Sequence, residues 1–363
     1  MQIETLKLSN FRNYDLLSME FDEGINIIYG ANAQGKTNIL ESIYMCSCGK
    51  SHKGSREKDI IKEGTKEAHI NGCFSGEHGK ERIDIHLKAG GTKGIAVNRV
   101  PIRKISELYG RVKTVIFSAE DLDIVKRGPA ARRRFMDMEL CQLDMLYVED
   151  LINYSRIRQQ RAELFKSLEE APKEKEELLD TLDIWDLQLV KAGCAIIKRR
   201  RKFIEEINDI IFDIHYELSA GREKIKIVYE PSVREEDFYE ELRKSRPKDM
   251  MTKATNVGPH RDDFSFFAEG KNMKVFGSNG QQRTCALSLK LSEIKMTEEI
   301  KKEKPLLLLD DVLSELDRSR QEELLKSLGK TQTIITCTGV DEFIATKIGR
   351  AKMFQIEEGK IRQ

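Results

Sequence analysis

Eight consecutive residues near the amino terminus have the spacing of a phosphate-binding loop. They are Gly30-Ala31-Asn32-Ala33-Gln34-Gly35-Lys36-Thr37, which fit the pattern G-x-x-x-x-G-K-[ST] at every position. In such a loop backbone N–H groups surround an anion, and the helix that follows adds the positive end of its dipole. We expect these residues, with the neighbouring Asn38, to bind ATP. Lys36 would then reach the β- and γ-phosphates, and the Thr37 hydroxyl would hold Mg²⁺.

Two adjacent carboxylates far downstream supply the acids that such a site needs. Asp310 and Asp311 follow the apolar run 306–309, which predicts a buried parallel strand ending at the edge where α/β sheets bind ligands. We expect Asp310 to coordinate Mg²⁺. We expect Asp311 and Lys36 to be the catalytic residues, with Asp311 polarising the attacking water. A helix N-cap is the alternative role of such a pair, but the phosphate loop favours the catalytic one.

A second candidate anion site precedes the helix-like run 283–300. Its sequence is Gly277-Ser278-Asn279-Gly280-Gln281-Gln282, a short turn that opens a helix. One chain does not need two sites for the same γ-phosphate. We therefore expect Ser278, Gly280 and Gln281 to cover the nucleotide held by a second copy of the chain.

The pattern of apolar residues indicates strands at both ends of the chain and helices between them. Helical periodicity runs from about residue 130 to 218, and Ala171-Pro172-Lys173 predicts a break between two antiparallel helices. The predicted strands are residues 3–8, 17–21, 25–29, 68–74, 82–87, 113–117, 224–229, 263–267, 274–276, 306–309, 333–336 and 353–356. This order predicts an α/β fold in which residues 1–125 and 221–363 form a head domain and 126–220 form an inserted helical lobe. Residues near 250–300 could belong to either part.

Composition limits the classes of protein that remain. The 62 basic and 61 acidic side chains nearly cancel, so a DNA-binding surface would have to be a local patch. Seven cysteines without a C-x-x-C pair argue against a disulfide framework or a zinc site and fit a reducing cytosol. With no signal peptide and no long apolar run, we expect a soluble, cytoplasmic protein without a membrane partner.

Several stretches resemble known families. Ser278-x-Gly280-Gln281 resembles the signature loop of ABC ATPases, and residues 314–317 resemble their D-loop. Residues 6–14 resemble the start of SMC- and Rad50-like ATPases. The chain as a whole is similar to the RecF family of bacterial recombination and repair proteins. The stretches that carry this likeness are Phe11-Arg12-Asn13-Tyr14, residues 117–122, Arg132-Arg133-Arg134-Phe135 and Gly258-Pro259-His260-Arg261-Asp262-Asp263.

The resemblance implies a fold and a function. The fold is an ABC-ATPase head assembled from both chain ends, with an inserted helical lobe in place of a long coiled coil. The function is ATP-induced dimerisation on double-stranded DNA near single-strand gaps or junctions, with weak, slow, DNA-stimulated ATP hydrolysis coupled to opening of the dimer. By the same resemblance the protein acts with RecO and RecR to load RecA, in recombinational repair and in replication-fork maintenance.

Some residues depart from the ABC pattern. Asp311 stands where many ABC proteins carry Glu, and no histidine follows the strand at 333–336. Thr336 or Thr338 could replace that histidine at the γ-phosphate, and Glu120 could replace the glutamine that links the lobes. The resemblance implies that Arg12 touches the nucleotide phosphates; the alternative is a surface arginine.

Basic clusters are candidates for DNA contact. We expect Arg132, Arg133 and Arg134 to bind DNA phosphates, ahead of residues 126–127 and 198–202, although charge runs are usually solvated helix faces. His260 lies close in sequence to Asp262 and Asp263, but one histidine beside two acids offers too few ligands to indicate a metal site. Two other function classes stay open: the nucleotide-binding subunit of an ABC transporter, and a nucleotide-gated clamp that does not need hydrolysis.

Overall fold

A computed structural model describes residues 1–77, 79–170, 175–339 and 350–362. The chain forms two compact units, one from residues 1–122 and 286–363 and the other from residues 123–285. Both ends of the chain therefore contribute to the first unit. No helix in the described ranges is long and apolar enough to cross a bilayer.

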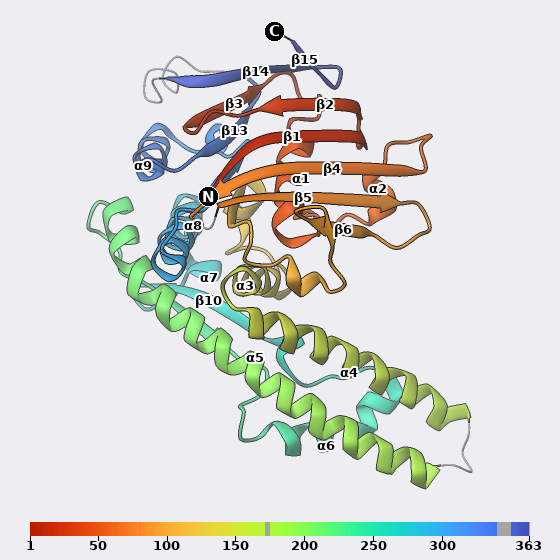
Figure 1. The fold of residues 1–363 in the computed structure, drawn as a ribbon. Helices are drawn as coiled ribbons and strands as arrows, with labels where there is room; N and C mark the ends of the chain where they lie inside the picture. Colours follow the sequence, from red (N-terminus) through yellow and green to blue (C-terminus); the bar gives the residue numbers. More distant parts are fainter. Residues whose placement is uncertain (78, 171–174, 340–349, 363) are drawn as a thin grey trace. The chain divides into compact units, whose positions relative to one another are not determined.

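A mixed sheet in the first unit brings distant segments of the chain together. Its order is β15-β14-β3-β13-β12-β8, and all strands except β15 run parallel (Figure 1). Every residue of β12 and β13 is buried, as a parallel strand covered on both faces requires. The bounds are β3 (Ile25–Tyr29), β8 (Thr114–Ser118), β12 (Leu306–Asp310), β13 (Thr333–Cys337), β14 (Ala351–Glu357) and β15 (Lys360–Arg362).

A second sheet in the same unit is antiparallel, in the order β2-β1-β4-β5-β6-β7. Along β4 and β5, apolar side chains on one face are buried and polar ones on the other face are more exposed. Helix α1 packs against both sheets and is buried nearly all round. The bounds are β1 (Gln2–Phe11), β2 (Tyr14–Glu20), β4 (Glu67–Gly76), β5 (Gly79–Lys88), β6 (Gly94–Val97), β7 (Val100–Pro101), α1 (Lys36–Cys48), α2 (Glu57–Ile60) and α9 (Arg318–Leu328).

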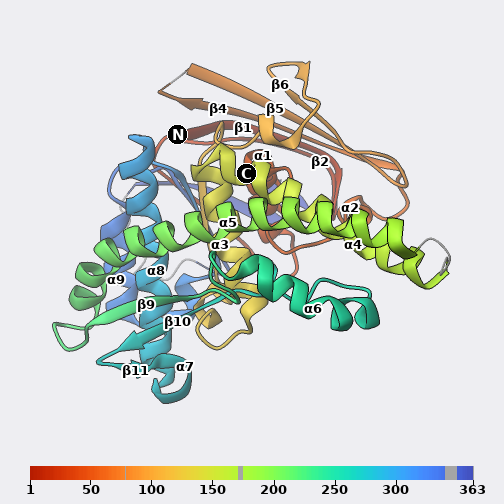
Figure 2. The same cartoon turned by 90° about the horizontal axis from the view of Figure 1, so that it is seen from below.

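The second unit is dominated by two long helices, α4 and α5, which run side by side (Figures 1 and 2). The helical periodicity predicted for this region corresponds to a buried face of α5, in which Leu182, Leu189 and Ile196 are completely buried. The bounds are α3 (Pro129–Leu143), α4 (Met145–Glu170), α5 (Lys175–Leu218), β9 (Ile225–Glu230), α6 (Phe238–Thr252), β10 (Asp263–Ala268), β11 (Lys271–Asn272), α7 (Met273–Phe276) and α8 (Asn279–Lys301), of which α8 continues into the first unit.

Three details differ from the sequence-based expectations. Residues 221–285 group with the helices, because β9 and β10 pair with each other and pack against α5 and α3. The predicted strand at 274–276 is the helical turn α7, in which the Asn272 side chain caps the backbone N–H of Lys274. Helix α6, which contains Pro247, was not predicted. The predicted break at 171–173 lies outside the described residues.

Candidate nucleotide-binding site

The phosphate loop connects β3 to α1 in a backbone conformation that needs glycine twice. Gly30 has φ 154° and Gly35 has φ 101°. A Cβ on Gly30 would lie 2.3 Å from the Ile356 carbonyl oxygen, and one on Gly35 would lie 2.5 Å from the Asn13 side chain. The two glycines thus allow the loop to pack closely against β14 and against the turn after β1.

Neighbouring segments hold the loop in shape. The Asn13 side-chain amide donates to the Gln34 carbonyl oxygen at 2.9 Å, and the Asn38 amide donates to Asn13 Oδ1 at 2.9 Å. The Gln34 side chain accepts a hydrogen bond from the Glu358 backbone N–H at 2.6 Å. The side chains of Gln34 and Asn38, expected at the nucleotide, therefore brace the loop. No sequence pattern predicted these roles of Asn13 and Glu358.

Lys36 lies inside the loop and is only 7% exposed. Its ammonium group donates to the carbonyl oxygens of Gly30 and Ala31, both at 2.8 Å. No carboxylate in the described part of the chain forms an ion pair with it. A buried cation without an ion-pair partner in the described residues, placed where backbone N–H groups gather at a helix start, is suited to hold an anion.

Thr37 and Asp310 meet as a possible magnesium site. The Thr37 hydroxyl donates to Asp310 Oδ1 at 2.7 Å, and the Thr336 hydroxyl donates to the same oxygen at 2.9 Å. Within the described residues, Asp310 Oδ2 accepts no hydrogen bond. A hydroxyl and a carboxylate with a spare oxygen are the hard ligands that Mg²⁺ prefers, so these residues fit the ion.

Asp311 adopts a left-handed backbone conformation, with φ 54°. Its N–H donates to the Thr336 hydroxyl at 3.0 Å, and its carboxylate accepts a bond from the Ser314 hydroxyl at 3.2 Å. Burial raises the pKa of Asp311, although Ser314 and the charge of Lys36 oppose the shift. A carboxylate with a raised pKa is a better proton acceptor, as a general base requires.

The two candidates to replace the ABC histidine have different environments. Thr336 is fully buried and its hydroxyl bonds to both acids, so it positions Asp310 and Asp311. Thr338 is exposed just beyond β13. Glu120 is also exposed, in a turn after β8 where Asp121 accepts hydrogen bonds from Ser118.

Arg12 binds protein groups in this structure. Four of its five N–H groups donate to other residues: two to Glu41 at 2.9 and 2.7 Å, one to the Asp59 carbonyl and one to the Ser55 hydroxyl, both at 2.6 Å. Burial alone would raise the pKa of Glu41, but hydrogen bonds from Arg12 and Ser51 outweigh it and hold that pKa below its ordinary value. The predicted contact of Arg12 with phosphate would require this network to open.

His52 is a neighbour of these groups that no sequence pattern indicated. Its ring packs edge-on against Tyr44, with ring centroids 5.8 Å apart. Burial lowers the pKa of His52, while the charges of Asp310 and Glu41 oppose the shift. Because its pKa is lowered, the His52 imidazole is neutral and does not offset the negative charges of Asp310 and Glu41.

The second candidate anion site, residues 277–282, lies in the second unit and opens α8. Ser278 and Gln281 form a reciprocal cap: the Ser278 N–H donates to Gln281 Oε1 at 2.8 Å, and the Gln281 N–H donates to Ser278 Oγ at 3.3 Å. The Gln281 amide also donates to Glu223 at 2.8 Å. Ser278 is exposed, and Val275 and Phe276 beside it are each 69% exposed. The loop is therefore preformed and accessible, next to apolar side chains that their own unit leaves uncovered.

The basic triplet 132–134 is not a uniform surface patch. Arg132 is only 3% exposed and binds both carboxylate oxygens of Asp263, at 2.6 and 2.8 Å. This arrangement indicates a structural role for Arg132, and its predicted contact with DNA would require the pair with Asp263 to open. Arg133 is half-buried and donates to the Asp262 carbonyl at 2.8 Å. Arg134 is half-buried as well.

The cluster at 198–202 is likewise largely paired. Arg199 binds Asp144 and Asp150, and Arg201 binds Glu235. Arg200 is 2% exposed and binds Asp137 and Asp262. These charges join elements within the second unit.

A different basic group surrounds the motif 258–263. The Tyr154 hydroxyl on α4 forms a hydrogen bond of 2.8 Å with His260 Nδ1. Arg158 follows one turn later on α4, which places it near Arg261. The Nε of Arg158 is buried without an acceptor, and no carboxylate in the described residues pairs with Arg158 or Arg261. Burial lowers the pKa of His260 to about 3, and the positive charges of Arg158, Arg261 and Arg133 add to the shift. Positive charge therefore gathers here, and within the described residues neither Arg158 nor Arg261 forms an ion pair with the neighbouring carboxylates.

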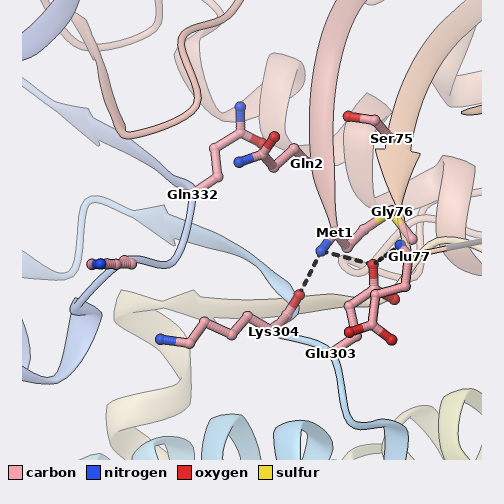
Figure 3. Close-up of a pocket in the computed structure, with 9 residues that line it drawn as sticks. Met1, Gln2, Ser75, Gly76, Glu77, Glu303, Lys304 and Gln332 are labelled. Carbon is pink, nitrogen blue, oxygen red and sulfur yellow. Dashed lines mark hydrogen bonds and ion pairs between the residues drawn. The ribbon is translucent and has the colours of Figure 1, made fainter. Parts of the chain in front are cut away.

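A pocket of about 310 Å³ lies at the other edge of the mixed sheet. Its lining residues Lys304 and Gln332 come just before β12 and β13 begin, whereas the phosphate loop follows the end of β3. In this pocket the Met1 ammonium binds Glu303 at 3.0 Å and donates to the Lys304 carbonyl at 2.8 Å (Figure 3). The pocket is therefore separate from the nucleotide site.

Comparisons with known proteins agree with this geometry. The sequence matches the RecF/RecN/SMC N-terminal domain family over residues 2–360. It is 53% identical over 361 residues to the DNA replication and repair protein RecF of Lachnospira eligens, which covers 99% of each chain. It is 49% identical over 363 residues to RecF of Lachnoclostridium phytofermentans, which covers 100% of each.

Solved structures show the same relationship. A structure of the recombination mediator protein RecF-ATP in the RecFOR pathway has a TM-score of 0.90 and 35% identity, and covers 99% of this chain and 97% of that one. An SMC head domain from Pyrococcus furiosus has a TM-score of 0.57 at 17% identity, covers 99% of this chain and 95% of that one, and shares the fold. With a phosphate loop, paired acids and a preformed second loop in place, the chain belongs to the RecF family of DNA replication and repair proteins.

Proposed function

We propose that the protein is an ATP-dependent DNA-binding ATPase of recombinational repair that closes into a dimer around nucleotide. The observation that carries this proposal is Lys36, a buried cation held by two loop carbonyls and not ion-paired with any carboxylate that the structure describes. The solved structures with ATP and with an ATP analogue, described as RecF-ATP and RecF-ATPrS, support the choice of ligand.

The second loop supplies the contact across the dimer. Ser278 and the start of α8 lie in the second unit, outside the phosphate loop's own sequence, and the cap between Ser278 and Gln281 would open for their N–H groups to bind an anion. The exposed Val275 and Phe276 beside Ser278 would be buried by a partner copy. A triphosphate held by one copy and covered by Ser278, Gly280 and Gln281 of the other then stabilises the closed dimer only while its γ-phosphate is present.

Hydrolysis is assigned to the paired acids. Asp310 and Thr37 would hold Mg²⁺, which neutralises phosphate charge when bound. Asp311 accepts a proton from the attacking water. Thr336 fixes the backbone of Asp311, and Ser314 fixes its carboxylate. Loss of the γ-phosphate removes the contacts with the second copy, so the dimer opens.

Contact with DNA is assigned to Arg133, Arg158 and Arg261 in place of the predicted triplet. Three guanidinium groups from three elements, with no carboxylate paired to Arg158 or Arg261 in the described residues, suit a phosphodiester backbone. The resemblance further implies duplex DNA near gaps, and cooperation with RecO and RecR in loading RecA. The RecFOR pathway, named for the solved relatives, supports those partners.

Light scattering with and without ATP–Mg²⁺ tests the dimer. Lys36→Ala is expected to stay monomeric with ATP, because the loop loses its only buried cation. Ser278→Arg is expected to bind ATP as a monomer but to fail to pair. Normal dimerisation of Lys36→Ala, or equal loss of ATP binding and pairing in Ser278→Arg, would contradict the proposal.

The role of hydrolysis is tested by Asp311→Asn. If the protein acts as a nucleotide-gated clamp, this variant still closes on ATP and stays on gapped DNA, and only its release is slowed. If hydrolysis drives each loading event, RecA loading stops as well. The transporter alternative is disfavoured by family membership along the whole chain.

The DNA contact is tested by Arg158→Gln and Arg261→Gln, measured as affinity for gapped duplex at several salt concentrations. Each is expected to weaken binding and to reduce the slope of log affinity against log salt by about one. Arg156→Gln, an exposed arginine on the same helix, is the matched control. An unchanged slope in both variants would remove this surface from the proposal.

A further inference from the structure

Two histidines and a glutamate meet on the polar face of the antiparallel sheet, in the part of the molecule that the proposed function does not use. His69 on β4 lies directly opposite His86 on β5 in the register of the ladder. Glu67 precedes His69 by two residues and so lies on the same face of β4. Figure 1 shows β4 and β5 as neighbouring strands.

The side chains of these three residues converge. Nε2 of His86 lies 3.0 Å from Glu67 Oε2, and Nε2 of His69 lies 3.8 Å from Glu67 Oε1. The two imidazole rings are stacked, with centroids 4.3 Å apart and planes 8° from parallel. One ligand atom from each residue can be chosen so that all lie within 4.8 Å of one another.

We propose that Glu67, His69 and His86 bind a divalent transition-metal ion, with Zn²⁺ as the best match. Bonds of about 2.0–2.2 Å to zinc put the ligand atoms of a tetrahedral site about 3.3 Å apart. Because each imidazole nitrogen binds a metal in the plane of its ring, the two stacked rings must tilt toward each other when the ion binds. Two imidazole nitrogens and one carboxylate oxygen select zinc, nickel or copper over magnesium, which prefers oxygen ligands alone. The site is thus distinct in chemistry from the one at Thr37 and Asp310.

The strand pairing explains how the site is preorganised. Residues opposite each other in an antiparallel pair have Cβ atoms about 4.5–5.5 Å apart, so the backbone already brings both imidazoles together. His69 and Glu67 are exposed and His86 is half-exposed, so the fourth position is open to water or to a donor group from another protein. The cysteine spacing that argued against zinc does not detect this site, because its ligands come from two strands.

Calorimetric titration of the full-length protein with ZnCl₂, without nucleotide, tests the proposal. Wild type is expected to bind one ion and to gain thermal stability from it. His69→Gln and His86→Gln are each expected to weaken binding by more than about 100-fold, since even the loss of an outer-shell partner weakens metal sites by 10- to 100-fold. Glu67→Gln is expected to bind more weakly than wild type.

Two controls address binding elsewhere. Glu4→Gln, on β1 of the same sheet, and Cys73→Ser, on the same face of β4, are expected to bind zinc like wild type. Wild type without a stoichiometric site, or both histidine variants with unchanged affinity, would overturn the proposal. Because nucleotide is absent, either outcome is independent of the proposed ATPase function.

Discussion

Two regions of the molecule bury positive charge in opposite ways. In the second unit, Arg161 is fully buried and its guanidinium binds Asp186, Asp249 and the Thr255 hydroxyl. In the first unit, the ammonium of Lys36 binds the carbonyl oxygens of its own loop and forms no ion pair within the described residues. The first charge is neutralised inside the protein, and the second is left for a ligand.

The contrast shows which buried charges mark a site. A buried ion pair with all its hydrogen bonds made holds elements together, and removal of one partner leaves the other uncompensated. A buried cation without a carboxylate partner destabilises its surroundings until an anion binds. Burial of charge alone is therefore no indication of function, and the missing partner is the informative feature.

The largest effect is expected for Arg161→Ala. It leaves Asp186 and Asp249 buried with one partner fewer, which should cost about 3–5 kcal/mol of stability. The single tryptophan, Trp185, packs in the same unit near Leu182, so its fluorescence during urea unfolding reports on this region. Lys166→Ala, at an exposed ion pair with Glu163, is the control and should change stability by less than about 1 kcal/mol. A similar small loss for both would erase the distinction between the two regions.

Lys36→Ala should show the reverse pattern. ATP affinity is expected to fall by at least about 100-fold, as for the loss of a donor to a phosphate-like charge. Stability without nucleotide should fall far less than in Arg161→Ala, because Lys36 forms no ion pair in the described residues and only its charge acts on Asp311. Titration with a fluorescent ATP analogue and urea unfolding measure the two quantities, with Lys62→Ala as a control. A large loss of stability would mean that Lys36 has a structural role like that of Arg161.

Gly30→Ala sharpens the comparison by changing the shape of the phosphate loop and no charge. The new Cβ would meet the Ile356 carbonyl at 2.3 Å, at a φ of +154° that side chains rarely adopt. We expect a loss of about 1–3 kcal/mol from strain, with weaker ATP binding. Gly24→Ala, where nothing lies within 4 Å, is the matched control. Wild-type stability and ATP affinity in Gly30→Ala would show that the loop is not held by β14.

Asp311→Asn should have the smallest effect on stability, below about 0.5 kcal/mol. The folded state raises the pKa of Asp311 above its ordinary value of 3.8, so ionisation of this group slightly destabilises the fold. Relative to wild type, the variant should be equally or slightly more stable at neutral pH. That difference should vanish as the pH falls through the raised pKa and wild type becomes protonated. A lower stability of the variant at neutral pH would contradict the assigned shift.

Local patterns predicted the parts of the site that adjacent residues determine. The phosphate loop and the paired acids have fixed spacing and follow apolar runs, so their strands and their meeting at one sheet edge could be predicted. Contacts between distant segments could not. Asn13 and Glu358 brace the loop from 21 and 324 residues away, and Thr336 aligns Asp310 and Asp311 from the next strand.

Charge patterns were the weakest guide. The sequence of an arginine run does not show whether its side chains are solvated or paired with carboxylates. Here the fold places Asp263 beside Arg132. The motif 258–263 was recognised by resemblance. The sequence did not reveal that Arg158, on a helix about a hundred residues earlier, lies near this motif with its Nε buried and without an acceptor. The prediction of a strand at 274–276 was wrong, because the pattern of three mostly apolar residues is the same in a short strand and in one helical turn.

The position of β3 in its sheet has a consequence for synthesis of the protein on the ribosome. Both neighbours of β3, β13 and β14, are translated more than 300 residues after it. At about 5–20 residues per second, the phosphate loop emerges some 15 to 60 seconds before the strands that hold it. A nascent or truncated chain therefore lacks the strands that flank β3, and the phosphate loop reaches the arrangement described above only when translation is nearly finished.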